Sequence, residues 1–287
     1  MNDYQIITDS GCDLPAEMLQ KLEVSMVSLT LLYQGQTLPD CVTEDTKAFY
    51  EGLRAGEVAS TAAVNPDQWA TEMEKALSRG KDALVLTFSS GLSTTYQSAV
   101  IAAEDLKEKY PDRKIRVVDT VAASLGQGLL VMYTCRKRDE GLSLDQLADW
   151  VEDNKLQLCH FFTVDDLMFL KRGGRVSAAT ALVGTMLQIK PVLHVDNEGH
   201  LINIGKVRGR KASLDALCDK AEKLGLPECR EVMYICHGDC LDDAEYLKAR
   251  LQEKLGVKEV FIGYTGAVIG SHSGPGTVAL FFLGQHR

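Results

Sequence analysis

The 287-residue sequence has no apolar run approaching the roughly 18 residues from which a transmembrane helix is predicted. It also lacks a cationic excess. Its formal net charge of −9 disfavours a nucleic-acid-binding surface, because such surfaces normally carry more lysine and arginine than acid. The first residues pass directly into an expected strand without the apolar segment of a signal peptide. We therefore expect a cytoplasmic protein with no integral membrane segment and no nucleic-acid partner.

Paired cysteines are missing as well. The eight cysteines form no Cys-x-x-Cys motif, which would indicate a zinc site or a redox centre. Several lie in apolar segments, where a free cysteine acts as a small hydrophobic side chain. Residues 236–240 resemble half of a metal site, but no second half follows. The sequence predicts structural thiols, no metal and no cofactor.

Motifs of two common enzyme classes are absent. No Gly-x-x-x-x-Gly-Lys-Ser/Thr motif occurs, and no Gly-x-Gly-x-x-Gly follows a strand, so neither nucleotide-binding loop is indicated. A serine hydrolase elbow needs Gly-x-Ser-x-Gly, and Ser93 has no glycine two residues after it. An acyl hydrolase or transferase that uses Ser93 and His272 stays open as an alternative, although we expect no catalytic residues.

The elements that are present indicate two α/β units. Composition is ordinary for a globular protein, with 45% hydrophobic residues, and the length suits one large or two modest domains. Up to about residue 155, strands alternate with helices, which predicts a parallel sheet between two helical layers. Expected strands there are 4–8, 24–32, 83–86 and 115–119, and expected helices are 15–22, 43–54, 66–77, one that includes 99–106, one within 120–140, and one from 144.

The pattern changes after residue 155. A hairpin followed by strand–helix units predicts a mixed sheet with helices on one side. Expected strands are 159–164, 189–195, 200–207, 231–236, 259–264 and 278–283, and expected helices are 165–172, 178–187, 212–224 and 243–255. The glycine-rich residues 273–277 come before a strand and predict a tight turn. We place two domains at residues 1–155 and 156–287.

One stretch joins a buried strand to a helix through hydroxyl-bearing residues. The helix is predicted from apolar residues at one-face spacing: Ala99, Ala102, Ala103 and Leu106. Open α/β sheets bind ligands beyond their strand ends, and helix N-termini favour anions. We predict an anion site at Ser93 and Thr94. The alternative is that one of them only caps the helix.

Two further segments allow two interpretations each. Ser60 and Thr61 form either an ordinary loop or a second hydroxyl-bearing edge of the same cleft. Lys171, Arg172 and Arg175 surround two glycines. They form either a solvated helix end whose cations complement the dipole or an arginine held toward an anion.

These motifs together resemble the DegV family over the whole chain. The matching residues are Thr8-Asp9-Ser10 with Asp13-Leu14-Pro15, Ser89-Ser90-Gly91-Leu92-Ser93 with Thr95-Tyr96-Gln97-Ser98-Ala99, Gly173-Gly174-Arg175, and His272 with Gly274-Pro275-Gly276. The resemblance implies a two-domain α/β fold: a three-layer parallel-sheet N-terminal domain, a mixed-sheet C-terminal domain, and one long-chain fatty acid, such as palmitate, stearate or oleate, in a tunnel between them. It also implies a bacterial carrier that presents the carboxyl group to a fatty-acid kinase for phospholipid synthesis.

The resemblance also implies roles for single residues. Its expected carboxylate-binding residues are Thr61, Ser93, Thr94, His272 and Ser273, and Arg175 is expected to face the kinase or another anion at the tunnel mouth. The sequence departs from the family pattern twice: Ala62-Ala63-Val64 replaces the usual Ser-Gln-Pro, and Thr94 replaces a glycine. Both departures adjoin the expected carboxylate site, so a sensor of an anionic metabolite is a third interpretation.

Overall fold

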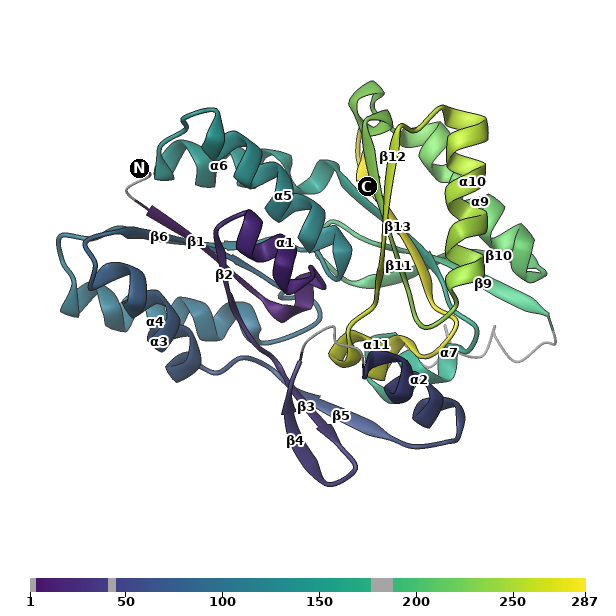
Figure 1. The fold of residues 1–287 in the computed structure, drawn as a ribbon, viewed down its shortest axis with the longest axis horizontal. Helices are drawn as coiled ribbons and strands as arrows, with labels where there is room; N and C mark the ends of the chain where they lie inside the picture. The colour runs from purple at the N-terminus through teal and green to yellow at the C-terminus, as the bar shows by residue number, and fades with distance from the viewer. Residues whose placement is uncertain (1–3, 41–44, 177–187) are drawn as a thin grey trace.

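The computed structural model describes residues 4–40, 45–176 and 188–287, which form three β-sheets (Figure 1). The first sheet is parallel, with the strand order β2-β1-β6-β7. Its strands are Val24–Val27 (β2), Tyr4–Asp9 (β1), Asp82–Thr87 (β6) and Ile115–Asp119 (β7). The parallel sheet expected from the alternating pattern is confirmed.

Helices cover both faces of this sheet. On β6, Leu84 and Leu86 belong to one hydrophobic core, and Ala83 and Val85 belong to another, because successive side chains point to opposite faces. The first face is covered by α1 (Ala16–Lys21), α5 (Leu125–Asp139) and α6 (Leu144–Asn154), and the second by α3 (Pro66–Leu77) and α4 (Thr95–Lys109) (Figure 1). This is the predicted three-layer arrangement.

Two helix starts follow directly from their cap residues. Asn65 before α3 and Ser143 before α6 each accept a hydrogen bond from the backbone N–H three residues later. The glutamine at that position, Gln68 or Gln146, accepts a hydrogen bond from the cap residue's own N–H. These reciprocal bonds pair donors that a helix terminus otherwise leaves free.

The second sheet is mixed and has the strand order β10-β9-β8-β13-β11-β12. Its strands are Leu201–Arg208 (β10), Ile189–Val195 (β9), Leu158–Thr163 (β8), Val278–Leu283 (β13), Val232–His237 (β11) and Glu259–Tyr264 (β12). On one face it packs against α9 (Arg210–Leu224) and α10 (Leu241–Leu255), as predicted. Its other face packs against α5 from the first half of the chain.

The third sheet corrects a prediction. The single strand expected at residues 24–32 is two strands, because the chain leaves the parallel sheet after Val27. Beyond it, the Leu29 N–H donates to Ser10 Oγ and the Ser28 hydroxyl donates to the Asp40 carbonyl, so this backbone is bonded outside the ladder. The separate antiparallel sheet has the order β4-β3-β5, with strands Gln36–Pro39 (β4), Thr30–Tyr33 (β3) and Ala59–Ala62 (β5).

A helix near the C-terminus was also not predicted. Residues Ala267–Ser273 form α11, so the turn expected at residues 273–277 begins only at Gly274, whose φ is +78°. Helix α11 packs among β3, β5, α2 (Thr46–Arg54) and α7 (Leu167–Arg172). The helix expected at residues 178–187 lies outside the described residues. Short 3₁₀ helices occupy Ser10–Cys12, Lys155–Gln157 and Pro227–Arg230.

Helix α5 lies between the parallel and mixed sheets (Figure 1). A Cβ on Gly126 would lie 2.2 Å from His160 Nε2, and one on Gly128 would lie 2.7 Å from the Cys12 carbonyl oxygen. The absence of a side chain at these two glycines therefore lets α5 pack closely against His160 and Cys12. Within the described ranges, no helix is long and apolar enough to cross a bilayer.

Candidate functional site

A cavity of about 480 Å³ lies where the three sheets meet. Its wall includes residues of β5, the β6–α4 loop, the β7–α5 loop, β8, β13 and α11. Most of the wall is apolar; Phe88, Phe162 and Phe281 supply its aromatic rings. This volume is within the range of about 300–1,000 Å³ that is usual for small-molecule sites. The cavity lies beyond the carboxyl end of β6, where ligands bind in open α/β sheets.

A threonine–histidine pair borders this cavity. Thr61 Oγ1 on β5 is 2.8 Å from His272 Nε2 on α11, although the two residues are 211 positions apart. Burial, together with the nearby charge of Arg175, lowers the pKa of His272 to about 4. The imidazole is therefore neutral at pH 7 and its Nε2 shares one hydrogen with the Thr61 hydroxyl. Thr61 lies in a strand, so the second interpretation of this segment, a hydroxyl-bearing edge of the cavity, is the one that the structure supports.

His272 occupies space that a side chain at position 173 would fill. A Cβ on Gly173 would lie 2.2 Å from His272 Nδ1, well inside van der Waals contact. Gly173 ends α7 with an ordinary right-handed backbone (φ −70°), so its lack of a side chain matters here for space. The Gly173-Gly174 pair thus both stops α7 and admits the imidazole.

Ser93 and Thr94 both contribute to the cavity wall, with Thr94 exposed and Ser93 half-buried. The Ser93 hydroxyl oxygen accepts a hydrogen bond from the Thr95 N–H at 3.2 Å and lies 2.8 Å from Thr95 Oγ1. Thr94 precedes α4, but its side chain makes no capping bond. The capping alternative is therefore wrong for Thr94, whereas Ser93 pairs the first N–H of α4 and also faces the cavity.

Arg175 differs from its two cationic neighbours. Its Nε and Nη2 donate to the Leu92 carbonyl at 3.3 and 3.1 Å, and its Nη1 donates to the Gly173 carbonyl. Burial lowers the pKa of the Arg175 guanidinium somewhat. Lys171 and Arg172 are exposed at the end of α7. Only Arg175 therefore fits the interpretation of an arginine held at the site.

Ser273 is the remaining expected site residue. It lines the cavity and is 5% exposed, and its hydroxyl has no hydrogen-bond partner among the described residues. The structure therefore brings all six sequence-predicted residues to one cavity: Thr61, Ser93, Thr94, Arg175, His272 and Ser273.

Sequence reasoning did not identify the cavity wall. His160 and Phe162 alternate on β8, and Ala279 and Phe281 alternate on the neighbouring β13, so all four share one face of the sheet. The period of two in these strands was the available signal. Every residue of β8 is buried, so only the fold shows which of its side chains face the cavity.

The polar groups do not form a hydrolytic pair. His272 bonds Thr61, and Ser93 bonds Thr95, so the alternative nucleophile and base are not joined by a hydrogen bond in this structure. In residues 4–40, 45–176 and 188–287, no three His, Cys, Asp or Glu side chains are grouped to hold a metal ion. The arrangement suits a ligand with an apolar body and one anionic or hydrogen-bonding end.

Comparison with known proteins extends over nearly the whole chain. A model of the DegV family, described as uncharacterised proteins, matches residues 3–285. A DegV domain-containing protein of Clostridium perfringens is 45% identical over 100% of this chain and 99% of its own length. A solved structure described as showing fatty acid binding of a DegV family protein from Thermus thermophilus has a TM-score of 0.86 and 33% identity, and covers 99% of this chain and 100% of that one. The structure of DegV, a fatty acid binding protein from Bacillus subtilis, has a TM-score of 0.83 and 28% identity, with the same coverage.

Proposed function

The chain belongs to the DegV family, and from this premise we propose that it binds one long-chain fatty acid such as palmitate, stearate or oleate. The acyl chain occupies the cavity between the sheets, and the carboxylate bonds to Thr61, Ser93 and His272. The observation that carries this proposal is the neutral Thr61–His272 pair at the wall of a mostly apolar cavity. The fatty-acid-binding relatives from Thermus thermophilus and Bacillus subtilis support the choice of ligand.

Burial of the chain supplies the affinity. Each buried methylene contributes about 0.8 kcal/mol, so about 14 methylenes give roughly 11 kcal/mol before costs. A micromolar complex needs about 8 kcal/mol, and ordering the ligand and wall takes several kcal/mol. A carboxylate buried without partners would cancel this gain. Hydroxyl and imidazole donors prevent that loss without forming a fixed ion pair.

The other predicted residues complete the head-group site. Ser273 supplies a buried hydroxyl without a partner, and Thr94 is exposed at the edge of the cavity. Arg175 places a positive charge beside the carboxylate. The small side chains of Ala62 and Ala63, which replace the bulkier family residues, also line the wall.

The protein acts as a carrier in the cytoplasm. It presents the carboxylate to a fatty-acid kinase, which phosphorylates it, and Arg175 faces that partner. The carrier itself has no ATP hydrolysis and no acyl-ester turnover. This part of the proposal rests on the family resemblance of the Gly173-Gly174-Arg175 motif and on the absence of a joined Ser93–His272 pair.

Native mass spectrometry of protein purified from a bacterial host, followed by lipid extraction, tests the proposal. We expect one bound fatty acid per chain. Thr61→Val, which removes only the hydroxyl, should weaken palmitate binding about tenfold, whereas Thr134→Val should not. Thr134 is the matched control because it is a buried threonine that donates within α5 and does not line the cavity.

Two outcomes would contradict the carrier proposal. Protein that carries no lipid and fails to take up added palmitate or oleate would indicate a different ligand, and a bound polar anion would favour the metabolite sensor. Turnover of an acyl ester that disappears in Ser93→Ala would favour the hydrolase instead.

A further inference from the structure

Helix α11 carries His272 and Ser273 but has little intrinsic stability. It is seven residues long and contains Gly270, and the residue before it, Gly266, has no side chain with which to cap it. Isolated helices shorter than about 12–15 residues are marginal in water. The position of His272 must therefore be set by contacts from elsewhere in the chain.

One of these contacts comes from Asp40, just after β4. Asp40 Oδ1 accepts a hydrogen bond from the Val268 N–H at 3.0 Å, in the first turn of α11. Its Oδ2 accepts one from the Ser10 hydroxyl at 2.8 Å. The side chain is 1% exposed, so water cannot replace either bond. Asp40 therefore pairs a backbone donor that the helix itself leaves free.

Asp40 is also bonded beside the small sheet that carries Thr61. Its N–H donates to the Leu29 carbonyl at 2.9 Å, directly before β3, and β3 pairs with β5 so that Leu31 lies opposite Thr61. Asp40 is thus bonded on one side to the residue before β3, which pairs with the strand of Thr61, and on the other side to the helix of His272. Val268 and His272 are four residues apart, which is about one helical turn.

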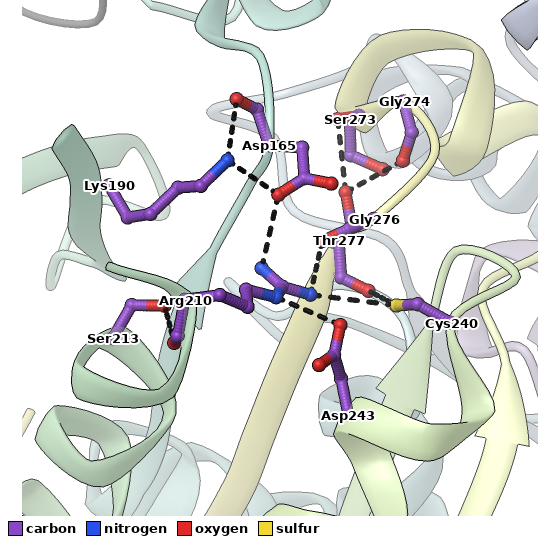
Figure 2. A network of polar contacts seen from close by, with 10 residues as sticks. All are labelled: Asp165, Lys190, Arg210, Ser213, Cys240, Asp243, Ser273, Gly274, Gly276 and Thr277. Carbon is purple, nitrogen blue, oxygen red and sulfur yellow. Dashed lines mark hydrogen bonds and ion pairs between the residues drawn. The ribbon is translucent and has the colours of Figure 1, made fainter. Parts of the chain in front are cut away.

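The rest of α11 is fixed on other sides. The Tyr50 hydroxyl donates to the Thr265 carbonyl at 2.8 Å, and a Cβ on Gly270 would lie 2.4 Å from that hydroxyl oxygen. At the C-terminal end, the Thr277 hydroxyl donates to the Ser273 and Gly274 carbonyls (Figure 2).

That C-terminal end is in turn tied to the mixed sheet and its helices. Arg210 donates to the Gly276 carbonyl at 2.7 Å while it pairs with Asp243 and Asp165, and Lys190 also pairs with Asp165 (Figure 2). Asp40 ties the other end of α11 to the chain beside β3, so His272 lies between an anchor on the mixed sheet and an anchor beside the small sheet.

We propose that Asp40 is a positioning residue of the head-group site, which sets the register of α11 so that His272 meets Thr61 and both can bind a carboxylate. Asp40 does not touch the ligand. This inference rests on the proposed function. Without the Asp40 bond, the first turn of α11 loosens, the His272–Thr61 contact lengthens, and the gain from binding an acid in place of an uncharged head group is lost.

The test compares palmitate with hexadecanol, which has the same chain and an uncharged head group. Dissociation constants are measured for the wild type and for Asp40→Ala, Asp40→Asn and Ser10→Ala. We expect wild type to prefer palmitate, and Asp40→Ala to lose about tenfold of that preference while hexadecanol affinity changes little. Asp40→Asn keeps an acceptor for the Val268 N–H and should retain the preference.

Ser10→Ala separates positioning from stability. It removes the other bond to Asp40 and the acceptor of the Leu29 N–H, and should lower the melting temperature while keeping the palmitate preference. If Asp40→Ala does not fold, Asp40→Ser serves instead, because its shorter side chain does not reach the Val268 N–H as the Asp40 carboxylate does. In the variant that loses the preference, the pKa of His272, followed by nitrogen NMR, should move up from about 4 as water reaches the ring.

The outcomes separate the two proposals. If wild type binds neither ligand, the proposed function fails. If wild type prefers palmitate and the folded Asp40→Ala and Asp40→Ser variants keep that preference, the role of Asp40 is overturned. Equal loss of affinity for both ligands would also overturn it, because that result describes a general loss of structure.

Discussion

Replacing Gly173 with alanine tests whether the position of His272 determines ligand affinity. Gly173 has φ −70° and ψ −10°, which alanine adopts without strain, so the substitution changes only the space beside the imidazole. The new methyl group would lie 2.2 Å from His272 Nδ1. Ordinary contact needs about 3.5 Å, so the ring must move by roughly 1 Å.

That displacement is enough to break the pair. The His272–Thr61 distance is 2.8 Å, and a separation beyond about 3.5 Å is no longer a hydrogen bond. A hydrogen bond to a charged group contributes about 1.5–3 kcal/mol, and about 1.4 kcal/mol corresponds to tenfold in affinity. Loss of the His272 contribution should therefore weaken palmitate binding by about ten- to a hundredfold.

Gly174→Ala provides the matched control. At Gly174 nothing lies within 4 Å of an added Cβ, but φ is +71°, so alanine there is strained by about 1–2 kcal/mol without touching the site. Calorimetric titration with palmitate should show weak binding for Gly173→Ala and near-normal binding for Gly174→Ala, whereas thermal unfolding should show the larger stability loss for Gly174→Ala. Wild-type affinity in a folded Gly173→Ala variant would refute the assigned role of His272.

Three further predictions concern stability. Burial raises the pKa of Asp40 from 3.8 to about 6, so between these pH values the folded state keeps a proton that the unfolded state loses. The contribution of Asp40 to the free energy of unfolding therefore falls by up to about 3 kcal/mol as the pH rises from about 4 to about 6. The difference in unfolding free energy between wild type and Asp40→Asn should fall over that window and then level off. Arg287→Ala leaves four backbone carbonyls without the guanidinium donor and should lower the free energy of unfolding in urea by about 3 kcal/mol. His286 is exposed, so His286→Ala should change that free energy little, and equal effects of the two substitutions would contradict this account. Asn65→Ala should cost about 1 kcal/mol of unfolding free energy with unchanged palmitate affinity, and an affinity loss would show that the start of α3 affects the site.

The regular elements could be predicted because their signals are local. Trp69 and Met73 on α3, and Leu147 and Val151 on α6, are buried at the spacing that the sequence indicates. Both helices begin at a cap residue whose capping partner lies three positions later in the sequence. The alternation of strands and helices likewise specified the parallel sheet, since that pattern needs no long-range information.

The elements that were missed depend on distant partners. Helix α11 contains residues of low helix propensity, and its supports, Asp40 and Tyr50, lie more than 200 residues earlier in the chain. The Thr61–His272 contact is equally remote. Spacing could not reveal it, and only the resemblance to the DegV family placed both residues at one site. The division at residue 155 stays a prediction.

The position of α5 has a consequence for synthesis and for fragments of the protein. Leu84 and Leu86 of the parallel sheet share one hydrophobic core with Phe162 and Phe281 of the mixed sheet, and α5 lies between them. While the chain is being translated, the first 155 residues can complete their own sheet, but one side of α5 stays bare until the second half emerges. A fragment beginning at residue 156 would expose the opposite surface, including Tyr234, and such apolar patches favour aggregation. Each half therefore covers apolar surface that the other half would expose on its own.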